Sequence, residues 1–161
     1  MRQSEVQQRL VDVLRAEFEP ELPSFAITEW RTLLGKYRHL VAGLEAGIAP
    51  PDPGVLAYFH DGEPVYLTAV ENLRERITAD LDRTGDLTRS HTRQLVARQH
   101  LGLQHIVRGQ PGHSDGDALT AVNDYLDTSG VAWIRSSSVT AARELTLLLL
   151  LAHKPPLNHD N

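Results

Sequence analysis

Apolar residues recur three or four positions apart in the first fifty residues of the chain. This spacing covers residues 4–18, SEVQQRLVDVLRAEF, and returns from Ile27 to Leu44 after the proline-marked connection EPELPSF. Such a period is typical of amphipathic helices. The stiff segment GIAPPDPG at residues 47–54 then interrupts it. The pattern therefore predicts an N-terminal extension of two helices within residues 1–50.

Two short runs rich in β-forming residues follow this extension. VLAYF spans residues 55–59, PVYLT spans residues 64–68, and HDGE lies between them. Asp61-Gly62 between two such runs is a strong signal of a tight β-hairpin. VAWIR at residues 131–135 has the same character, so we expect a third strand there.

Helical spacing marks four further segments of the chain. They are Asn72–Leu81, Ser90–Leu103, Asp117–Leu126 and a final helix from about Thr140 to His153. Ser90 and Asp115 are suitable N-caps for the second and third of these helices. Strands and helices in this order predict a small α/β (α+β) fold.

Composition and charge narrow the classes of protein to consider. The 161 residues are 41% hydrophobic and 23% charged, which is typical of one soluble domain with a hydrophobic core. The absence of cysteine excludes disulfides and thiolate metal sites and fits a cytoplasmic protein. The longest apolar run, Leu145 to Ala152, is far shorter than the roughly 20 residues of a membrane span. A net charge of −5 argues against binding nucleic acid over the whole surface, and leaves room for a local basic patch.

Four segments between residues 54 and 158 resemble the GIY-YIG nuclease superfamily in order and spacing. The family's Gly-Ile-Tyr and Tyr-Ile-Gly motifs correspond here to GVL (54–56) and YLT (66–68), respectively. Its Asn-Leu-x-x-Arg pattern is matched by NLRER (72–76), and its Pro-x-x-Asn pattern by PPLN (155–158). The resemblance implies a GIY-YIG-like domain over residues 51–161, with a small central antiparallel sheet flanked by helices. Family members cleave phosphodiester bonds with tyrosines that act on water, an arginine on the phosphate and a glutamate that holds a divalent metal such as Mg²⁺.

The matching positions divide into retained and substituted residues. By this resemblance Tyr66, Arg76 and Asn158 keep the second tyrosine, the arginine and the terminal asparagine. The substituted positions are the first tyrosine, the last glycine of the motif, a basic residue two positions later and the metal-holding glutamate; they are now Leu56, Thr68, Val70 and Thr146. The positions for water activation, for metal binding and for the additional basic side chain are thus all substituted. The resemblance therefore implies an eroded or rebuilt active site.

Asp80 is the candidate replacement for the missing metal ligand. It lies four residues after Arg76 and so on the same face of the expected helix. A carboxylate there either ligates Mg²⁺ or pairs with Arg76, and both interpretations stay open. Thr146 offers a neutral oxygen, whereas hard divalent cations prefer carboxylates. Tyr66 and Arg76 would suit a phosphate or sulfate, and the alternative is that Tyr66 packs inward beside an Arg76–Asp80 ion pair.

A basic segment follows this helix. Residues 83–108 hold five arginines, three histidines and one acidic residue. On one helix Arg89, Arg93 and His100 would share a side and could contact a phosphate backbone. The alternative is an ordinary solvated helix face.

Three hypotheses on function follow from the sequence. The first is a nuclease-like domain, weakly active or inactive, that binds nucleic acid. The second is an enzyme or enzyme subunit of another class that acts on a small molecule bearing a phosphate or sulfate. The third is a non-catalytic protein that binds a partner, or a second copy of itself, through N-terminal residues such as Trp30, Leu33 and Tyr37.

Overall fold

A four-stranded antiparallel sheet forms the centre of the protein. The computed structural model describes residues 23–83, 87–100, 102 and 116–158. The strands are β1 (His39–Leu40), β2 (Gly54–His60), β3 (Glu63–Val70) and β4 (Gly130–Arg135), and their order across the sheet is β1-β4-β2-β3. The hairpin and the third predicted strand are confirmed as β2, β3 and β4. The predicted helix at residues 4–18 and the predicted N-cap Asp115 lie outside the described residues.

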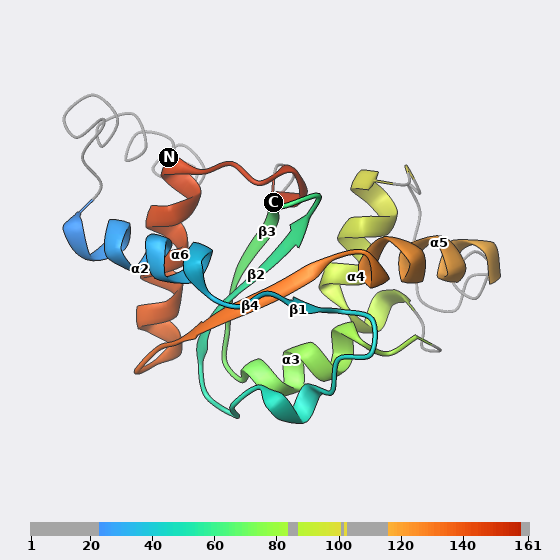
Figure 1. Ribbon diagram of the computed structural model, residues 1–161, viewed down its shortest axis with the longest axis horizontal. Coiled ribbons are helices and arrows are strands. Elements are labelled where there is room, and N and C mark those ends of the chain that lie inside the picture. Colours follow the sequence, from blue (N-terminus) through green and yellow to red (C-terminus); the bar gives the residue numbers. More distant parts are fainter. Residues whose placement is uncertain (1–22, 84–86, 101, 103–115, 159–161) are drawn as a thin grey trace, which may run out of the picture.

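Helices cover both faces of this sheet (Figure 1). On one face lie α2 (Ser24–Gly35) and α6 (Val139–Ala152). On the other lie α3 (Leu73–Asp80), α4 (His91–Leu95) with its π-helical continuation η3 (Val96–His100), and α5 (Gly116–Asp127). Short 3₁₀ turns occur at η1 (Ala46–Ile48), η2 (Leu87–Arg89) and η5 (Pro156–Asn158). The described residues therefore form an α+β fold with five α-helices packed on an antiparallel sheet.

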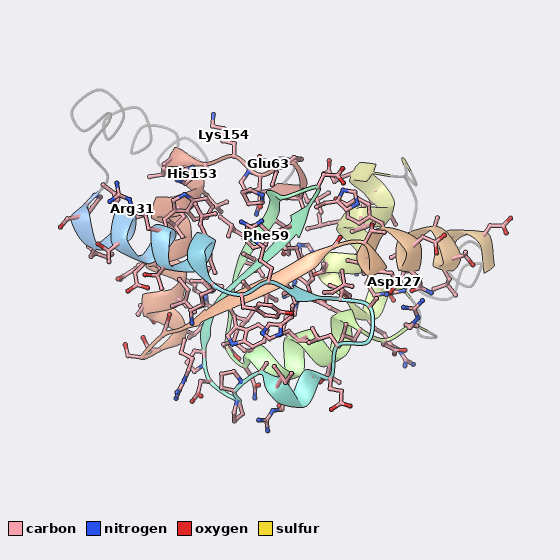
Figure 2. All side chains as sticks on the ribbon, in the orientation of Figure 1. Arg31, Phe59, Glu63, Asp127, His153 and Lys154 are labelled. Carbon is pink, nitrogen blue, oxygen red and sulfur yellow. The ribbon has the colours of Figure 1, made fainter. Side chains whose placement is uncertain are left out.

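Alternate residues of β2 supply the two hydrophobic cores. Val55, Ala57 and Phe59 are buried against α2 and α6, and Figure 2 shows Phe59 within the side-chain packing. Leu56 and Tyr58 are buried on the opposite face, against α3, α4 and α5. This alternation is what a strand buried on both faces requires, because successive side chains point to opposite sides.

The predicted helix Ile27–Leu44 is wrong in its second half. The helix α2 ends at Gly35, and Lys36 is already extended with φ −69° and ψ 151°. His39 and Leu40 then form β1, which pairs with Val131 and Gly130 of β4. Pairing with a distant strand satisfies backbone groups that a continued helix would have bonded internally. The apolar spacing past Gly35 does not mark one helical face, because Tyr37 and Leu40 are exposed and Val41 is buried in the core on the other side of the sheet from α2.

The residues expected to bind a partner are mostly part of this chain's own core. Trp30 and Leu33 are buried against β2, β4 and α6, and Trp30 stacks on His153 with ring centroids 4.2 Å apart. Tyr37 is exposed, but it lies beyond the end of α2. A partner surface built on Trp30 and Leu33 is therefore ruled out while α2 is docked. The proposed domain boundary at residue 50 stays a prediction, although residues 24–50 supply both a helix and a strand to the fold.

Candidate functional site

A β-bulge in the hairpin decides which face Tyr66 occupies. Asp61 and Gly62 have φ values of 52° and 83°, as the tight turn of a right-twisted hairpin requires. The pairing sets Phe59 opposite Pro64 and then shifts, so that Tyr58 lies opposite Tyr66. A one-residue shift moves all later side chains to the other face. Without it Tyr66 would face α6; with it Tyr66 faces α3, and its ring centroid lies 6.5 Å from that of Tyr58.

The helix α3 brings Arg76 and Asp80 to the same place. Asn72 caps its N-terminus by accepting a hydrogen bond from the Glu75 amide. Arg76 and Asp80 are one turn apart, and Arg76 Nε lies 3.4 Å from Asp80 Oδ1. The predicted pairing of these two residues is confirmed. Their inner ends face the two tyrosines of the hairpin.

The carboxylate of Asp80 is the centre of a buried hydrogen-bond network. Its side chain is 1% exposed. Oδ2 accepts from the Tyr58 hydroxyl at 2.6 Å and from Thr92 Oγ1 at 2.9 Å. Oδ1 accepts from Ser90 Oγ at 2.7 Å and from Arg76 Nε. Burial and then the Asp80 charge raise the pKa of Tyr58 well above its usual range, so the phenol stays protonated and donates.

Arg76 is held by this network but is not enclosed by it. Its Nη2 lies 3.3 Å from the Tyr66 hydroxyl and 3.2 Å from Thr92 Oγ1. Burial lowers the pKa of the guanidinium, but Asp80 and Tyr66 outweigh this effect and the net shift is upward. The side chain is 22% exposed, and none of its hydrogen bonds to the described residues uses Nη1. One end of the guanidinium is therefore open to a ligand.

His91 and a second arginine, Arg98, lie near Tyr66 and Arg76. The ring centroid of His91 lies 6.4 Å from that of Tyr66. Burial lowers the pKa of His91, and the positive charges of Arg76 and Arg98 lower it further. His91 is thus neutral at pH 7, and both cations act on its ring. We call Tyr66, Arg76, His91 and Arg98 the Tyr66 cluster.

Several members of this arrangement were not identified from the sequence. Tyr58, Thr92 and His91 were missed, and Ser90 was expected to cap a helix without contacting Asp80. Ser90 does cap α4 by accepting from the Arg93 amide, and its hydroxyl donates to Asp80. No local pattern links these residues, since they lie 10 to 22 positions from Asp80 in the chain.

The four positions that differ from the GIY-YIG pattern lie on opposite faces of the sheet. Leu56 and Val70 are buried on the Tyr66 face, and Thr68 lies between Tyr66 and Val70 on the same face of β3. Thr146 is buried on α6, which packs on the opposite face of the sheet. The side chains of Tyr66 and Thr146 are therefore separated by the sheet.

Asn158 has a structural position at the edge of the sheet. Its side-chain amide accepts from the Leu67 amide at 2.9 Å and donates to the Leu67 carbonyl at 2.9 Å. It thus supplies both partners that a neighbouring strand would give to Leu67. This pairing protects the outer edge of β3.

The described side chains do not fit a divalent metal ion. All strong acceptor positions of Asp80 are used by three hydroxyls and Arg76. Thr146 contributes a neutral oxygen on the wrong face of the sheet, and among the described residues no three His, Cys, Asp or Glu side chains are grouped for metal binding. A magnesium ion is usually held by one or two carboxylates together with water, and the Asp80 carboxylate is already engaged by four donors.

The basic segment does not form one continuous face. Arg89 is exposed at the end of η2, whereas Arg93 is 2% exposed within α4. The prediction that they share a solvent-facing side is wrong, because the N-cap Ser90 begins a new helix between them. The side chain of His100 lies outside the described part of the structure. Arg98 is exposed on η3, and its charge acts on His91.

Two further observations bear on what this chain is. Within the described ranges no helix has both the length and the apolar character needed to cross a membrane. Comparison with protein-family models, with curated proteins and with solved structures found no match to this chain.

Proposed function

We propose that this chain is a GIY-YIG-like domain that binds nucleic acid through a backbone phosphate at the Tyr66 cluster, without the family's metal-dependent cleavage. The observation that carries the proposal is the contact between Arg76 and the Tyr66 hydroxyl. These two residues are the retained tyrosine and arginine of the family pattern, and the fold has brought them together across ten residues of sequence. Tyr66 is buried and holds the guanidinium in place, while Arg76 is 22% exposed and keeps Nη1 free of hydrogen bonds to the described residues.

The electrostatics of the cluster suit a phosphate ester. Arg76 and Arg98 both act on His91, so the positive potential extends from α3 to η3. Hydrogen bonds from a guanidinium to a phosphate are charge-assisted and directional. A bound phosphate would favour the protonated form of His91, so its pKa would rise on binding.

The same network argues against the family's cleavage mechanism. The first tyrosine is Leu56, which is buried and has no proton to exchange. The Asp80 carboxylate is engaged by four donors and would have to lose several of them to ligate a metal. The chain therefore keeps the part of the site that holds phosphate and lacks the part that activates water and binds metal.

Binding to fluorescent oligonucleotides tests the proposal. We would measure anisotropy with single-stranded and duplex DNA at low salt for wild type, Arg76→Gln and Arg31→Gln. Arg31 is an exposed arginine on α2, across the sheet from the cluster (Figure 2), so it controls for the change in net charge. We expect Arg76→Gln to weaken binding at least tenfold and Arg31→Gln less than twofold. The logarithmic salt slope should be about −2, because each neutralised phosphate contributes roughly −0.9 and two arginines are available.

Three outcomes would contradict the proposal. One is an equal loss of affinity in both arginine variants. The second is no oligonucleotide binding at low salt, which would favour a small phosphate- or sulfate-bearing molecule as the ligand. The third is nicking of supercoiled plasmid in Mg²⁺ or Mn²⁺ that disappears in Tyr66→Phe and Arg76→Gln, which would show that cleavage is retained.

A further inference from the structure

Arg93 carries a buried charge without a carboxylate partner. Its side chain is 2% exposed. Among the described residues no acidic side chain lies within ion-pair distance of its guanidinium, and Nε has no hydrogen-bond partner. The remaining nitrogens donate to the Asp80 carbonyl at 3.4 Å and to Asn123 Oδ1. A buried cation held by neutral oxygens is costly unless something else supplies negative charge.

The carboxylates around Arg93 are paired with other arginines or act on it at longer range. Arg83 forms a two-pronged ion pair with Asp127 on α5. The Asp80 carboxylate pairs with Arg76, one turn earlier on α3. Burial lowers the pKa of Arg93, and the longer-range effects of Asp82 and Asp80 do not reverse this shift. The negative charges near Arg93 therefore act on it at longer range, and among the described residues no carboxylate contacts its guanidinium directly.

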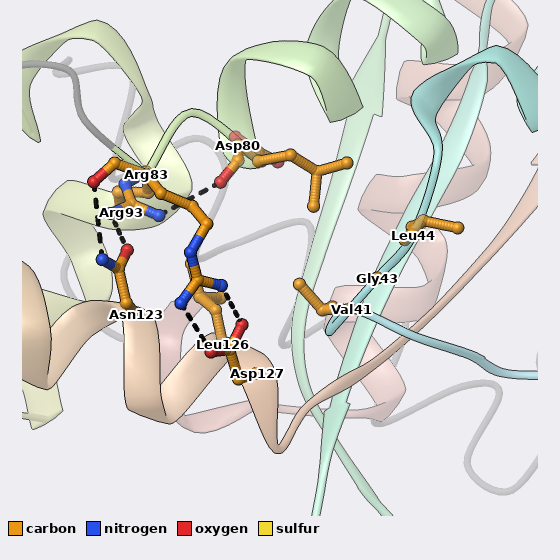
Figure 3. Close-up of a pocket in the computed structure, with 10 residues that line it drawn as sticks. Val41, Gly43, Leu44, Asp80, Arg83, Arg93, Asn123, Leu126 and Asp127 are labelled. Atoms are coloured by element: carbon orange, nitrogen blue, oxygen red, sulfur yellow. Dashed lines mark hydrogen bonds and ion pairs between the residues drawn. The ribbon is translucent and has the colours of Figure 1, made fainter.

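Arg93 lines a small pocket that is separate from the Tyr66 cluster (Figure 3). The pocket has a volume of about 180 Å³ and does not include Tyr66, Arg76 or His91. Figure 3 shows Arg93 and Asn123 at the left and the Arg83–Asp127 pair beside them, toward the centre of the view. Val41 and Leu44 lie on the opposite side of the pocket, and Leu126 lies beside Asp127. This size is below that of most drug-sized ligand sites, which are about 300–1,000 Å³.

We propose that this pocket binds a small organic oxyanion, a carboxylate or phosphate on a short aliphatic group. The oxyanion accepts hydrogen bonds from the Arg93 guanidinium and the Asn123 amide, and replaces the missing counter-charge. The aliphatic group packs against Val41, Leu44 and Leu126. A polymer such as DNA is excluded by the volume, so this site differs from the Tyr66 cluster in the class of ligand it takes.

Thermal unfolding with three probes tests this site. Inorganic phosphate, butyl phosphate and butyrate would each be titrated at matched ionic strength with chloride as reference. We expect butyl phosphate or butyrate to raise Tm by about 3 °C at ten times its Kd. Inorganic phosphate should need a higher concentration, because it makes no apolar contact.

Two substitutions and one control assign the ligand to Arg93. Asn123→Asp places a carboxylate beside Arg93 with almost no change in size, so the ligand-induced rise in Tm should disappear. The readout is that rise and not the starting Tm, because the variant also loses the 3.4 Å bond from Asn123 to the Arg83 carbonyl. Arg93→Gln should lose the ligand-induced rise in Tm as well. If the Arg93→Gln variant does not fold, the result for Asn123→Asp alone tests whether the ligand binds at Arg93. Arg76→Gln should keep the rise.

The proposal is overturned by any of three results. The first is the absence of a rise beyond the chloride reference with all three probes. The second is a full ligand-induced rise in Asn123→Asp. The third is loss of the rise in Arg76→Gln with retention in Asn123→Asp, which would place the anion at the Tyr66 cluster instead.

Discussion

The two tyrosines of the hairpin lie opposite each other, yet we expect their hydroxyls to matter for different reasons. Tyr58 donates to the buried Asp80 carboxylate at 2.6 Å, whereas Tyr66 accepts from Arg76 at 3.3 Å. Tyr58→Phe and Tyr66→Phe are therefore a matched pair. Each removes one oxygen and leaves the buried ring in place, so the apolar burial is nearly unchanged.

The expected loss of stability follows from the bond that each variant removes. A hydrogen bond to a charged group contributes about 1.5–3 kcal/mol, and a neutral or long one contributes about 0.5–1.5 kcal/mol. Asp80 keeps three other donors in Tyr58→Phe, so the carboxylate is not orphaned and we expect a loss of about 2 kcal/mol. Arg76 keeps Asp80 and Thr92 in Tyr66→Phe, so the expected loss is about 0.5 kcal/mol.

Urea unfolding, followed by circular dichroism, measures both values. With a slope of about 2 kcal/mol per molar urea, the midpoint should fall by roughly 1 M in Tyr58→Phe and by roughly 0.25 M in Tyr66→Phe. Oligonucleotide affinity should show the opposite order, with the larger loss in Tyr66→Phe. Equal midpoints in the two variants, or a neutral Tyr58→Phe, would refute the account of Asp80 as the centre of a stabilising network.

Three further predictions concern pH, the sheet edge and a close backbone approach. The pKa of Tyr58 is raised in the folded state, so the contribution of Tyr58 to the free energy of unfolding is complete below the unfolded pKa of about 10 and is lost as pH rises further. The difference in urea midpoint between wild type and Tyr58→Phe should therefore narrow above pH 10. A constant difference would contradict the raised pKa. Asn158→Ala removes two hydrogen bonds to the Leu67 backbone, so we expect about 1–2 kcal/mol of destabilisation and faster hydrogen exchange at the Leu67 amide; unchanged exchange would argue against the edge pairing. A Cβ on Gly54 would lie 2.2 Å from a backbone oxygen of β4. Gly54→Ala should therefore destabilise the fold by about 1–3 kcal/mol and lower the thermal midpoint by several degrees. Gly47→Ala is the control and should leave the midpoint unchanged, because no atom lies within 4 Å of the new Cβ.

Local sequence signals predicted most of the elements of this fold. The Asp61-Gly62 turn, the Ser90 cap and the period of α6 each act over a few residues, so the pattern is readable without tertiary information. The Arg76–Asp80 pair was predictable for the same reason, since residues four apart on a helix are neighbours.

The failures share a dependence on distant contacts. β1 has two residues, too few for an alternating pattern, and it exists because His39 finds Val131 some ninety residues later. The face of Tyr66 depends on the shift beside Pro64, and a proline inside a strand signals a bulge without fixing which residue is displaced. Tyr58, Ser90 and Thr92 are ordinary strand, cap and helix residues until the fold gathers them around Asp80.

Asp80 connects the two candidate sites and explains why they should take different ligands. The carboxylate of Asp80 balances the positive charge of Arg76, and the Arg76 side chain is also partly exposed to water. Binding one small anion at the Tyr66 cluster therefore contributes little free energy. A polymer that also reaches Arg98 gains more, because contacts with several phosphates add. The carbonyl of Asp80 accepts a hydrogen bond from Arg93, which has no carboxylate in direct contact among the described residues. The pocket that Arg93 lines is too small for a polymer. Saturating butyrate should therefore leave oligonucleotide affinity unchanged, and direct competition between the two would show that they share one site.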